Sequence, residues 1–263
     1  MGAQAVSLEF HASSGGIPDP RDTTVMRFAR WSLLLILLGA IAGFSQTNNA
    51  GDTATLDKVL KQMDATAASF KSTEANFTWD QYTKVIDEHD AQQGTVFFRR
   101  NGDEIQMAAD ITKHNDVPEM KYVLFTDGKV EVYQPKIDQV TQYKAGKNRA
   151  EFESFLVLGF GGSGRDLQRS FNVRYAGTEN VMGINTAKLE LVPKAAKVRS
   201  MFSRIILWID PARGVSVQQK FIDDASGDYR LAKYTDIKLN QKISDSAFKL
   251  KTTGKTRFIS PQG

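Results

Sequence analysis

The stretch at residues 122–143, YVLFTDGKVEVYQPKIDQVTQY, decides the fold. Its Asp127-Gly128 pair is a two-residue turn signal, because a type I′ turn needs a positive φ at both central residues. On both sides of this pair apolar and polar residues alternate, as they do in strands that bury one face. Pro135 lacks a backbone donor and therefore ends the second strand or marks an edge of the sheet. We predict a β-hairpin followed by a third strand at residues 137–143.

The same pattern of strands and turns continues over most of the chain after residue 75. Asn101-Gly102 marks another hairpin, between strands predicted at residues 92–100 and 104–109. The residues between that hairpin and the central one, which include Pro118, are interpreted as a linker. About eleven strands without an internal repeat favour one antiparallel sheet that curls on itself. The later predicted strands cover residues 171–177, 186–192, 204–210, 215–222 and 229–239.

Two segments break this strand pattern. In the first, apolar residues recur at helical spacing and predict an amphipathic helix over residues 56–67. The second, residues 150–160 (AEFESFLVLGF), predicts a short helix stopped by Gly161-Gly162, and residues 164–170 can add another turn. Because an apolar stripe must lie on something apolar, we predict a mainly β fold with an α lid. The stripe of the first helix consists of Leu56, Val59, Leu60, Met63 and Ala67.

The first 45 residues are interpreted as a leader with an export signal. Residues 31–44, WSLLLILLGAIAGF, follow two arginines and are too short for a comfortable membrane span. They predict a signal peptide at residues 26–45, cleaved after Ala42 or Ser45, and therefore export; a membrane anchor is the alternative. Residues 1–25 are either an over-long start before Met26 or a disordered leader. Residues 46–263 are predicted to form one domain.

Composition and motifs point away from several functional classes. The chain has no Cys. It has 34 Lys and Arg and 30 Asp and Glu, and the basic residues do not form a stripe of the kind that nucleic-acid binding requires. The glycines at residues 159–164 match a dinucleotide pattern but lack a βαβ unit around them. His11, His89 and His114 are too scattered to predict a metal site. We therefore predict no catalytic residue, metal, cofactor or nucleic-acid partner.

The surplus of large apolar side chains is the informative feature. A curled sheet of about eleven strands can leave a hollow interior, whereas eight strands are filled by their own side chains. The pattern alone favours an ordinary core, and a lipid-binding cavity is the alternative. The residues predicted to line such a cavity are Phe97, Met107, Phe125, Phe152, Phe155, Leu156, Phe160, Leu207 and Phe221.

Several motifs resemble the outer-membrane lipoprotein carrier family (LolA-like). The central signature is Asp-Gly-Lys followed by Tyr133-x-Pro135-x-x-x-Gln139-x-Thr141. Residues 94–100, GTVFFRR, are similar to the family's G-x-L-x-V-K/R-R-P strand, and residues 189–193, LELVP, to its L-x-P-K segment. These similarities occur in order along most of the chain that follows the leader.

The resemblance implies an incomplete antiparallel β-barrel of about eleven strands, with helices covering its mouth. It also implies a periplasmic carrier, not an enzyme, that binds the acyl chains of lipoproteins or another lipid. The implied partners are an inner-membrane ABC transporter complex and an outer-membrane acceptor, and we expect a monomer. The helix at residues 56–67 and the segment at residues 150–160 would form the lid.

The family pattern also implies a gating arginine that precedes a proline. Arg100 occupies that place, and Asn101 stands where the family has the proline. Arg99 is the alternative gate, because strand alternation turns only one of two neighbours inward. Two other functions stay open: a lipid-binding sensor or chaperone of the same fold, and a lipid hydrolase, for which the sequence shows no nucleophile and base.

Overall fold

The computed structural model describes residues 49–102, 104–144, 158 and 160–260. These residues belong to one compact unit, Asn48–Gly263. The leader segments predicted at residues 1–25 and 26–45, and nearly all of the helix predicted at residues 150–160, lie outside the described residues. None of the described helices combines the length and the apolar character that a membrane span requires.

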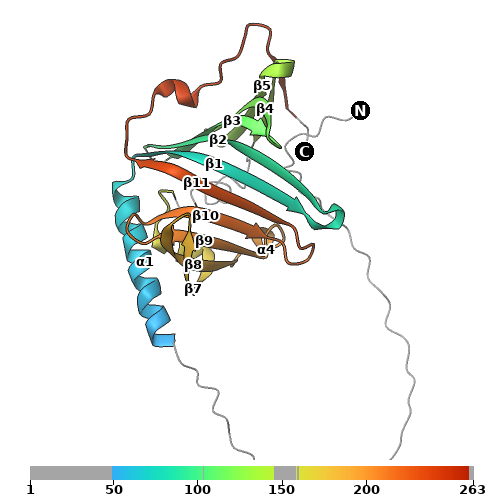
Figure 1. The fold of residues 1–263 in the computed structure, drawn as a ribbon. Helices are drawn as coiled ribbons and strands as arrows, with labels where there is room; N and C mark the ends of the chain where they lie inside the picture. Colours follow the sequence, from blue (N-terminus) through green and yellow to red (C-terminus); the bar gives the residue numbers. More distant parts are fainter. Residues whose placement is uncertain (1–48, 103, 145–157, 159, 261–263) are drawn as a thin grey trace, which may run out of the picture. The chain divides into compact units, whose positions relative to one another are not determined.

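Twelve strands form one open sheet in the order β12-β6-β5-β4-β3-β2-β1-β11-β10-β9-β8-β7 (Figure 1). This arrangement confirms the predicted fold class, a mainly β protein built on an unclosed antiparallel sheet. Every neighbouring pair is antiparallel except β12 and β6, which are parallel. The strands are β1 (Ser72–Thr83), β2 (Glu88–Asn101), β3 (Glu104–His114), β4 (Val117–Thr126), β5 (Lys129–Gln134), β6 (Gln139–Lys144), β7 (Phe171–Val181), β8 (Ile184–Pro193), β9 (Arg204–Asp210), β10 (Val215–Ile222), β11 (Tyr229–Leu239) and β12 (Arg257–Ile259).

The central hairpin forms as predicted. Asp127 and Gly128 have φ angles of 51° and 66°, the left-handed backbone that a type I′ turn requires. Strand β5 ends at Gln134, directly before Pro135. The predicted linker around Pro118 is wrong, because these residues form the start of β4. Pro118 lies beside an irregularity in the β3–β4 pairing, where its missing donor is tolerated.

The described helices are α1 (Asn49–Ser69), α3 (Gly164–Ser170) and α4 (Ala196–Arg199), with short 3-10 turns η1 (Lys84–Ile86), η2 (Pro135–Ile137) and η4 (Asp245–Phe248). Helix α1 contains the predicted amphipathic stripe, and Val59, Leu60 and Met63 are buried. Helix α3 starts at a capping box in which Ser163 and Asp166 exchange hydrogen bonds, a reciprocal arrangement that satisfies two free amides.

The sheet has two faces, and we call the one that α1 covers the inner face. Strand β9 shows the alternation: Ile205, Leu207 and Ile209 point inward into the cluster that includes α1. Ile206 and Trp208 point outward into a separate cluster. Because both sets are buried, the outer face is also covered by other residues over part of its area.

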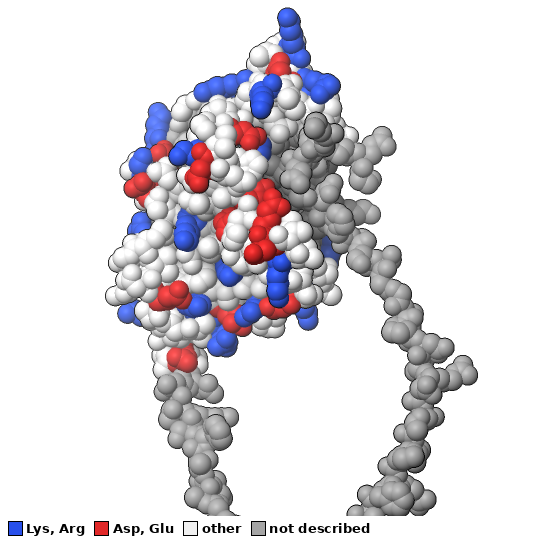
Figure 2. Space-filling model, turned by 45° about the vertical axis from the view of Figure 1, so that its right-hand side comes forward, with Lys and Arg blue, Asp and Glu red and all other residues white. Residues whose placement is uncertain are grey.

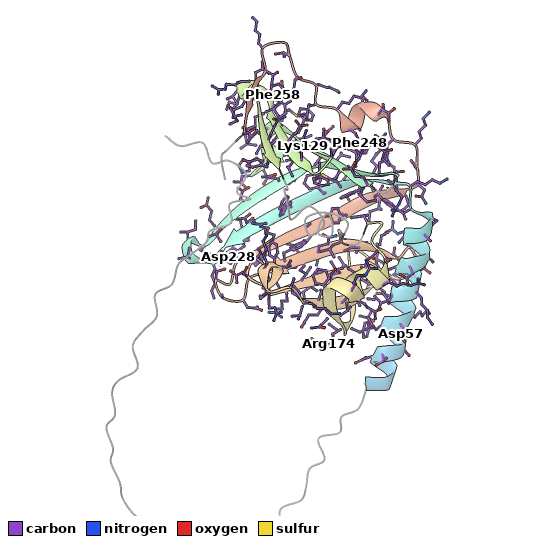
Figure 3. The ribbon with its side chains drawn as sticks, turned by 180° about the vertical axis from the view of Figure 1, so that it is seen from behind. Asp57, Lys129, Arg174, Asp228, Phe248 and Phe258 are labelled. Carbon is purple, nitrogen blue, oxygen red and sulfur yellow. The ribbon has the colours of Figure 1, made fainter. Side chains whose placement is uncertain are left out.

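The C-terminal segment covers the outer face at the other side of the sheet. After β11 the chain crosses β2–β4, where Phe248 packs with Ala108 and Leu124. It then adds β12 to the edge strand β6. Figure 3 shows Phe248 and Phe258 of this segment toward one end of the sheet, and Asp57 of α1 toward the other.

Candidate functional site

The candidate site is the inner face itself, an apolar surface that runs across neighbouring strands. On one side Met107 pairs with Phe125 across β3 and β4, and Phe125 pairs with Val130 of β5. On the other side Leu207 of β9 lies between its partners in β8 and β10. Phe125 and Leu207 are fully buried. The inner face therefore gathers apolar side chains that are far apart in the sequence.

Helix α1 covers the inner face of β7–β9 (Figure 1). Leu60 and Met63 belong to the same buried cluster as Leu189, Leu191 and Leu207. Burial of a large aliphatic side chain contributes about 1.5–3 kcal/mol, so this stripe provides most of the attachment of the helix. The predicted lining residue Leu207 thus lies in the same buried cluster as the protein's own helix.

Few polar contacts seat α1, and they lie near its C-terminal half. The Thr66 hydroxyl donates to the Arg213 carbonyl at 2.8 Å, and Gln62 Nε2 donates to the Ala212 carbonyl at 3.3 Å. The Arg165 amide donates to Asp64 Oδ1 at 3.2 Å. At Gly164 a side chain would collide with the backbone of Leu60, so glycine is needed for this close approach.

Phe160 fills the centre of the inner face. Its ring stacks on Phe98 with centroids 5.3 Å apart and meets Tyr234 edge-on at 4.8 Å. Nearby, Gln219 Nε2 donates a hydrogen bond to the Leu158 carbonyl. Burial raises the pKa of the Tyr234 hydroxyl well above its ordinary value, so this tyrosine stays neutral. Leu158 and Phe160 therefore form a second part of the cover over the inner face.

The two adjacent arginines of β2 point to opposite faces. Arg100 lies on the inner face, where its Nη2 donates to the Gly161 carbonyl at 3.4 Å and its guanidinium faces the Phe70 ring. Arg99 lies on the outer face, where it pairs with Asp245 and stacks over Phe248 at 4.2 Å. Strand alternation thus gives Arg100, and not Arg99, access to the backbone that follows the predicted lid segment.

The predicted lining residues divide into three groups. Met107, Phe125, Phe160, Leu207 and Phe221 lie on the inner face, in its buried clusters or packed against them. Phe97 lies on the outer face beside the Phe248 cluster, and its neighbour Phe98 takes the inner position. Residues 152, 155 and 156, which are Phe, Phe and Leu, lie outside the described residues.

Two pockets border the described residues. One pocket of about 440 Å³ is bordered by the β7–β8 turn and β11, and another of about 530 Å³ lies on the exposed side of α1. Neither pocket is lined by a residue that the sequence predicted to form the cavity. Instead α1, Leu158 and Phe160 occupy the inner face.

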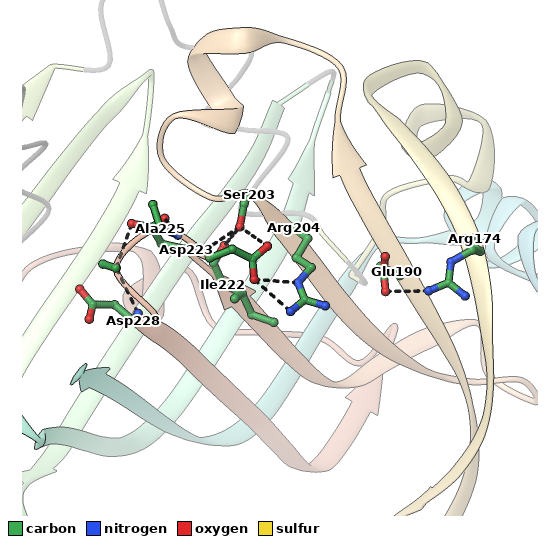
Figure 4. Close-up of polar contacts among 10 residues, drawn as sticks. Arg174, Glu190, Ser203, Arg204, Ile222, Asp223, Ala225 and Asp228 are labelled. Carbon is green, nitrogen blue, oxygen red and sulfur yellow. Dashed lines mark hydrogen bonds and ion pairs between the residues drawn. The ribbon is translucent and has the colours of Figure 1, made fainter. Parts of the chain in front are cut away.

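The outer face of β7–β10 carries paired charges. Arg174 pairs with Glu190 at 2.9 Å, and Arg204 pairs with Asp224 at 3.0 Å (Figure 4). On the face shown in Figure 2, acidic and basic side chains are interspersed. Exposed pairs of this kind contribute about 0–1 kcal/mol each and favour a solvated surface. Within the described ranges no group of His, Asp and Glu has the geometry of a metal site.

Comparison with known proteins identifies the family. The model of the outer membrane lipoprotein carrier protein LolA family matches residues 68–251, more than half of the chain. The chain belongs to the LolA family. This family consists of carrier and binding proteins rather than enzymes. A search of curated protein sequences finds no match.

Solved structures are similar to this chain at low identity. The LolA-family chain is similar to an uncharacterized conserved protein from Thermus thermophilus, with 10% identity and a TM-score of 0.50 over 79% of this chain and 99% of that one. It is also similar to a putative outer membrane lipoprotein-sorting protein domain from Vibrio parahaemolyticus, with 13% identity, a TM-score of 0.41 and coverages of 73% and 95%. The chain is also similar to the lipoprotein LppX of Mycobacterium tuberculosis, with 14% identity and a TM-score of 0.41 over 73% of this chain and 98% of that one.

Proposed function

We propose that this protein is a periplasmic carrier that binds the acyl chains of lipoproteins, or of another envelope lipid, against its inner face. The observation that carries this proposal is the apolar inner face covered by a helix that few polar contacts hold in place. Transfer of acyl chain out of water gains about 0.8 kcal/mol per methylene, so a lipid in transit needs such a surface. Membership of the LolA family supports the same function.

In this proposal the described arrangement is the closed form of the carrier, because its own side chains cover the inner face. Helix α1 and Phe160 occupy the surface that acyl chains would use, so loading replaces protein side chains by lipid. The exchange trades one set of apolar contacts for another and leaves a small net free energy. A small net free energy suits a protein that must both take up and release its cargo.

Arg100 is proposed as the gate of this carrier. Its contact with the Gly161 carbonyl ties β2 to the segment that crosses the inner face. A long, exposed hydrogen bond of this kind contributes about 1 kcal/mol or less, which favours the closed cover and does not prevent its opening. The segment at residues 150–160 and α1 would then move together as the lid.

The route of the cargo is also part of the proposal. Export through the signal peptide at residues 26–45 would place the carrier in the periplasm. A monomeric carrier would receive lipid from an inner-membrane ABC transporter complex and deliver it to an outer-membrane acceptor.

Mass spectrometry of lipid that co-purifies with the protein from periplasmic extracts tests the binding step. We expect intact acylated species in a fixed ratio to the protein. Hydrolysed products would instead indicate an enzyme, and a preparation that carries no lipid, even after incubation with total envelope lipid, would refute the carrier.

A disulfide between α1 and the β9–β10 turn tests the lid. The chain has no Cys of its own, so the double variant Thr66→Cys with Arg213→Cys forms a single defined crosslink. We expect the oxidised variant to lose lipid uptake and to regain it after reduction. The single variant Thr66→Cys is the control for the lost side-chain hydrogen bond, and Arg213→Cys is the control for the lost ion pair with Asp210. Equal uptake in the oxidised and reduced forms would show that α1 does not open.

The neighbouring arginines of β2 provide a matched test of the gate. Arg100→Gln removes the contact with the Gly161 carbonyl, whereas Arg99→Gln removes an ion pair with Asp245 on the outer face. We expect faster lipid uptake for Arg100→Gln and unchanged uptake for Arg99→Gln, measured by stopped-flow with a fluorescent fatty acid. The gate assignment fails if the two variants behave alike.

A further inference from the structure

Arg230 lies on the inner face at the start of β11. Its partners across the ladder are Gln81 of β1 and Phe221 of β10. Its guanidinium carbon is 5.3 Å from the centre of the Phe202 ring, and Phe202 in turn packs edge-on against Phe221 at 5.1 Å. Both aromatic residues pack against the buried cluster beneath α1. A permanent positive charge therefore borders the apolar surface proposed to bind lipid.

Arg230 differs from the other arginines of the described residues. Its guanidinium takes part in no hydrogen bond and no ion pair within the described part of the chain. Nine other arginines lie there, and each has a hydrogen-bonding or ion-pairing partner: Arg99, Arg100, Arg165, Arg169, Arg174, Arg199, Arg204, Arg213 and Arg257. An unpaired, partly buried guanidinium is unfavourable, because its donors lose water without gaining an acceptor.

The acidic residues nearest to it along the chain already have other partners. Asp224 accepts from Arg204 and Ser203, and Asp223 accepts from the Ala225 amide and the Ser226 hydroxyl (Figure 4). Asp228 accepts from the Lys84 amide at 2.9 Å. The bond from Ser203 to Asp224 also joins the β8–β9 connection to the β10–β11 turn. The framework around Arg230 is thus fixed while its guanidinium stays free.

The environment of Arg230 is apolar rather than acidic. Burial lowers the pKa of its guanidinium, and no neighbouring charge contributes to this change. On the inner face two strands away, Asp90 Oδ1 lies 2.9 Å from His114 Nε2. Arginine remains protonated at neutral pH even so, because its pKa in water is above 12. The site therefore offers a full positive charge with a low local dielectric, which strengthens the binding of an anion.

We propose that Arg230 binds the anionic group, a carboxylate or a phosphate, of an amphiphile whose acyl chain lies on the inner face. The guanidinium fork matches either anion in a bidentate way. Phe202 and Phe221 would contact the first methylenes of the chain. This inference rests on the proposed lipid-binding function, and it adds a preference for acidic lipids over neutral ones.

Calorimetric titration of the full chain with three single-chain probes tests this site: oleate, lysophosphatidylglycerol and oleyl alcohol, each below its aggregation concentration. We expect the wild type to bind at least one of the acidic probes about tenfold or more tightly than oleyl alcohol, as a charge-assisted bond provides. Arg230→Met should lose that preference and keep its affinity for oleyl alcohol. Arg230→Lys, which keeps the charge, should retain part of it, and Arg174→Met on the outer face should change nothing.

The outcomes separate the site from the carrier. Preference for oleate alone assigns a carboxylate, and preference for lysophosphatidylglycerol alone assigns a phosphate. Equal affinity for all three probes, unchanged in Arg230→Met, overturns the Arg230 site and leaves lipid binding intact. If the wild type binds none of the probes, both the site and the carrier proposal fail. Circular dichroism of Arg230→Met and Arg230→Lys shows that the variants are folded.

Discussion

Two ends of the folded unit cover opposite faces of the same sheet, and they are attached in different ways. Helix α1 lies on the inner face of β7–β9 through an apolar stripe and side-chain hydrogen bonds such as Thr66 to the Arg213 carbonyl. The C-terminal segment lies on the outer face of β2–β4 and ends in β12, whose backbone pairs with β6. One cover is held by side chains and the other is part of the sheet.

This difference indicates which cover can move. Removal of β12 breaks backbone pairing and exposes an edge strand, which favours aggregation. Removal of α1 breaks apolar contacts that an acyl chain can replace. The helix therefore has the properties of a lid, and the C-terminal segment has those of a fixed part of the fold.

Truncation of the outer cover should produce the largest effect on stability. Phe248→Ala removes a buried ring that packs on Ala108 and Leu124 and carries Arg99 above it. We expect the free energy of unfolding in urea to fall by about 4 kcal/mol, within the range of such truncations. Lipid affinity of the folded variant should not change. Loss of affinity at nearly normal stability would contradict the division between the covers.

Truncation of the inner cover should be slightly less destabilising and should alter function. Met63→Ala removes a fully buried side chain of α1, and we expect a loss of about 3 kcal/mol. Because the helix then holds the inner face less tightly, a fluorescent fatty acid should bind faster than it binds the wild type. Unchanged uptake kinetics at the reduced stability would argue that α1 is a structural element only.

A single hydrogen bond of the lid provides a smaller test. Thr66→Val keeps the shape of the side chain and removes its bond to the Arg213 carbonyl, so we expect a loss of about 1 kcal/mol. The matched control is Thr55→Val, because the Thr55 hydroxyl bonds only within α1, to the Gly51 carbonyl at 2.9 Å. Thermal unfolding and uptake rates of both variants are compared, and only Thr66→Val should speed uptake.

The smallest effect concerns the pH dependence of the outer cover. Hydrogen bonds from Thr256 and Thr253 hold the pKa of Asp138 below its ordinary value of 3.8. The ionised form is thus the stabilised one, and its contribution is present above that value and lost as the pH falls through the lower, folded pKa. We expect the Tm of Asp138→Asn to lie below that of the wild type at pH 5, and the difference to shrink as the pH falls below 3.8. A constant difference would rule out this titration.

Local signals predicted much of the fold from the sequence. The strands at residues 204–210, 215–222 and 229–239 have the predicted bounds, because turn residues limit each of them. The Asp127-Gly128 turn was equally local. The start of β4 was missed because Pro118 usually breaks a strand, and only the pairing irregularity beside it allows it there.

The site was harder to predict, because it depends on which strands pair. Phe97 and Phe98 are adjacent, and no local signal determines which of them points inward. Arg230 gave no signal at all, since its position between Gln81 and Phe221 requires the β1–β11 and β10–β11 registers. Strand alternation did predict that Arg99 and Arg100 point to opposite faces of the sheet. The contact of Arg100 with the Gly161 carbonyl shows that Arg100 is the one on the inner face.

The strand order has a consequence for how the chain folds. Strands β1–β6 form one run of successive hairpins and β7–β11 form another, so each run needs only nearby residues to pair. The two runs meet at β1 and β11, where Tyr82 pairs with Tyr229. These two residues are separated by most of the domain's sequence. Loop closure of this size is slow, so we expect two hairpin arrays to form early and their joining to limit the folding rate.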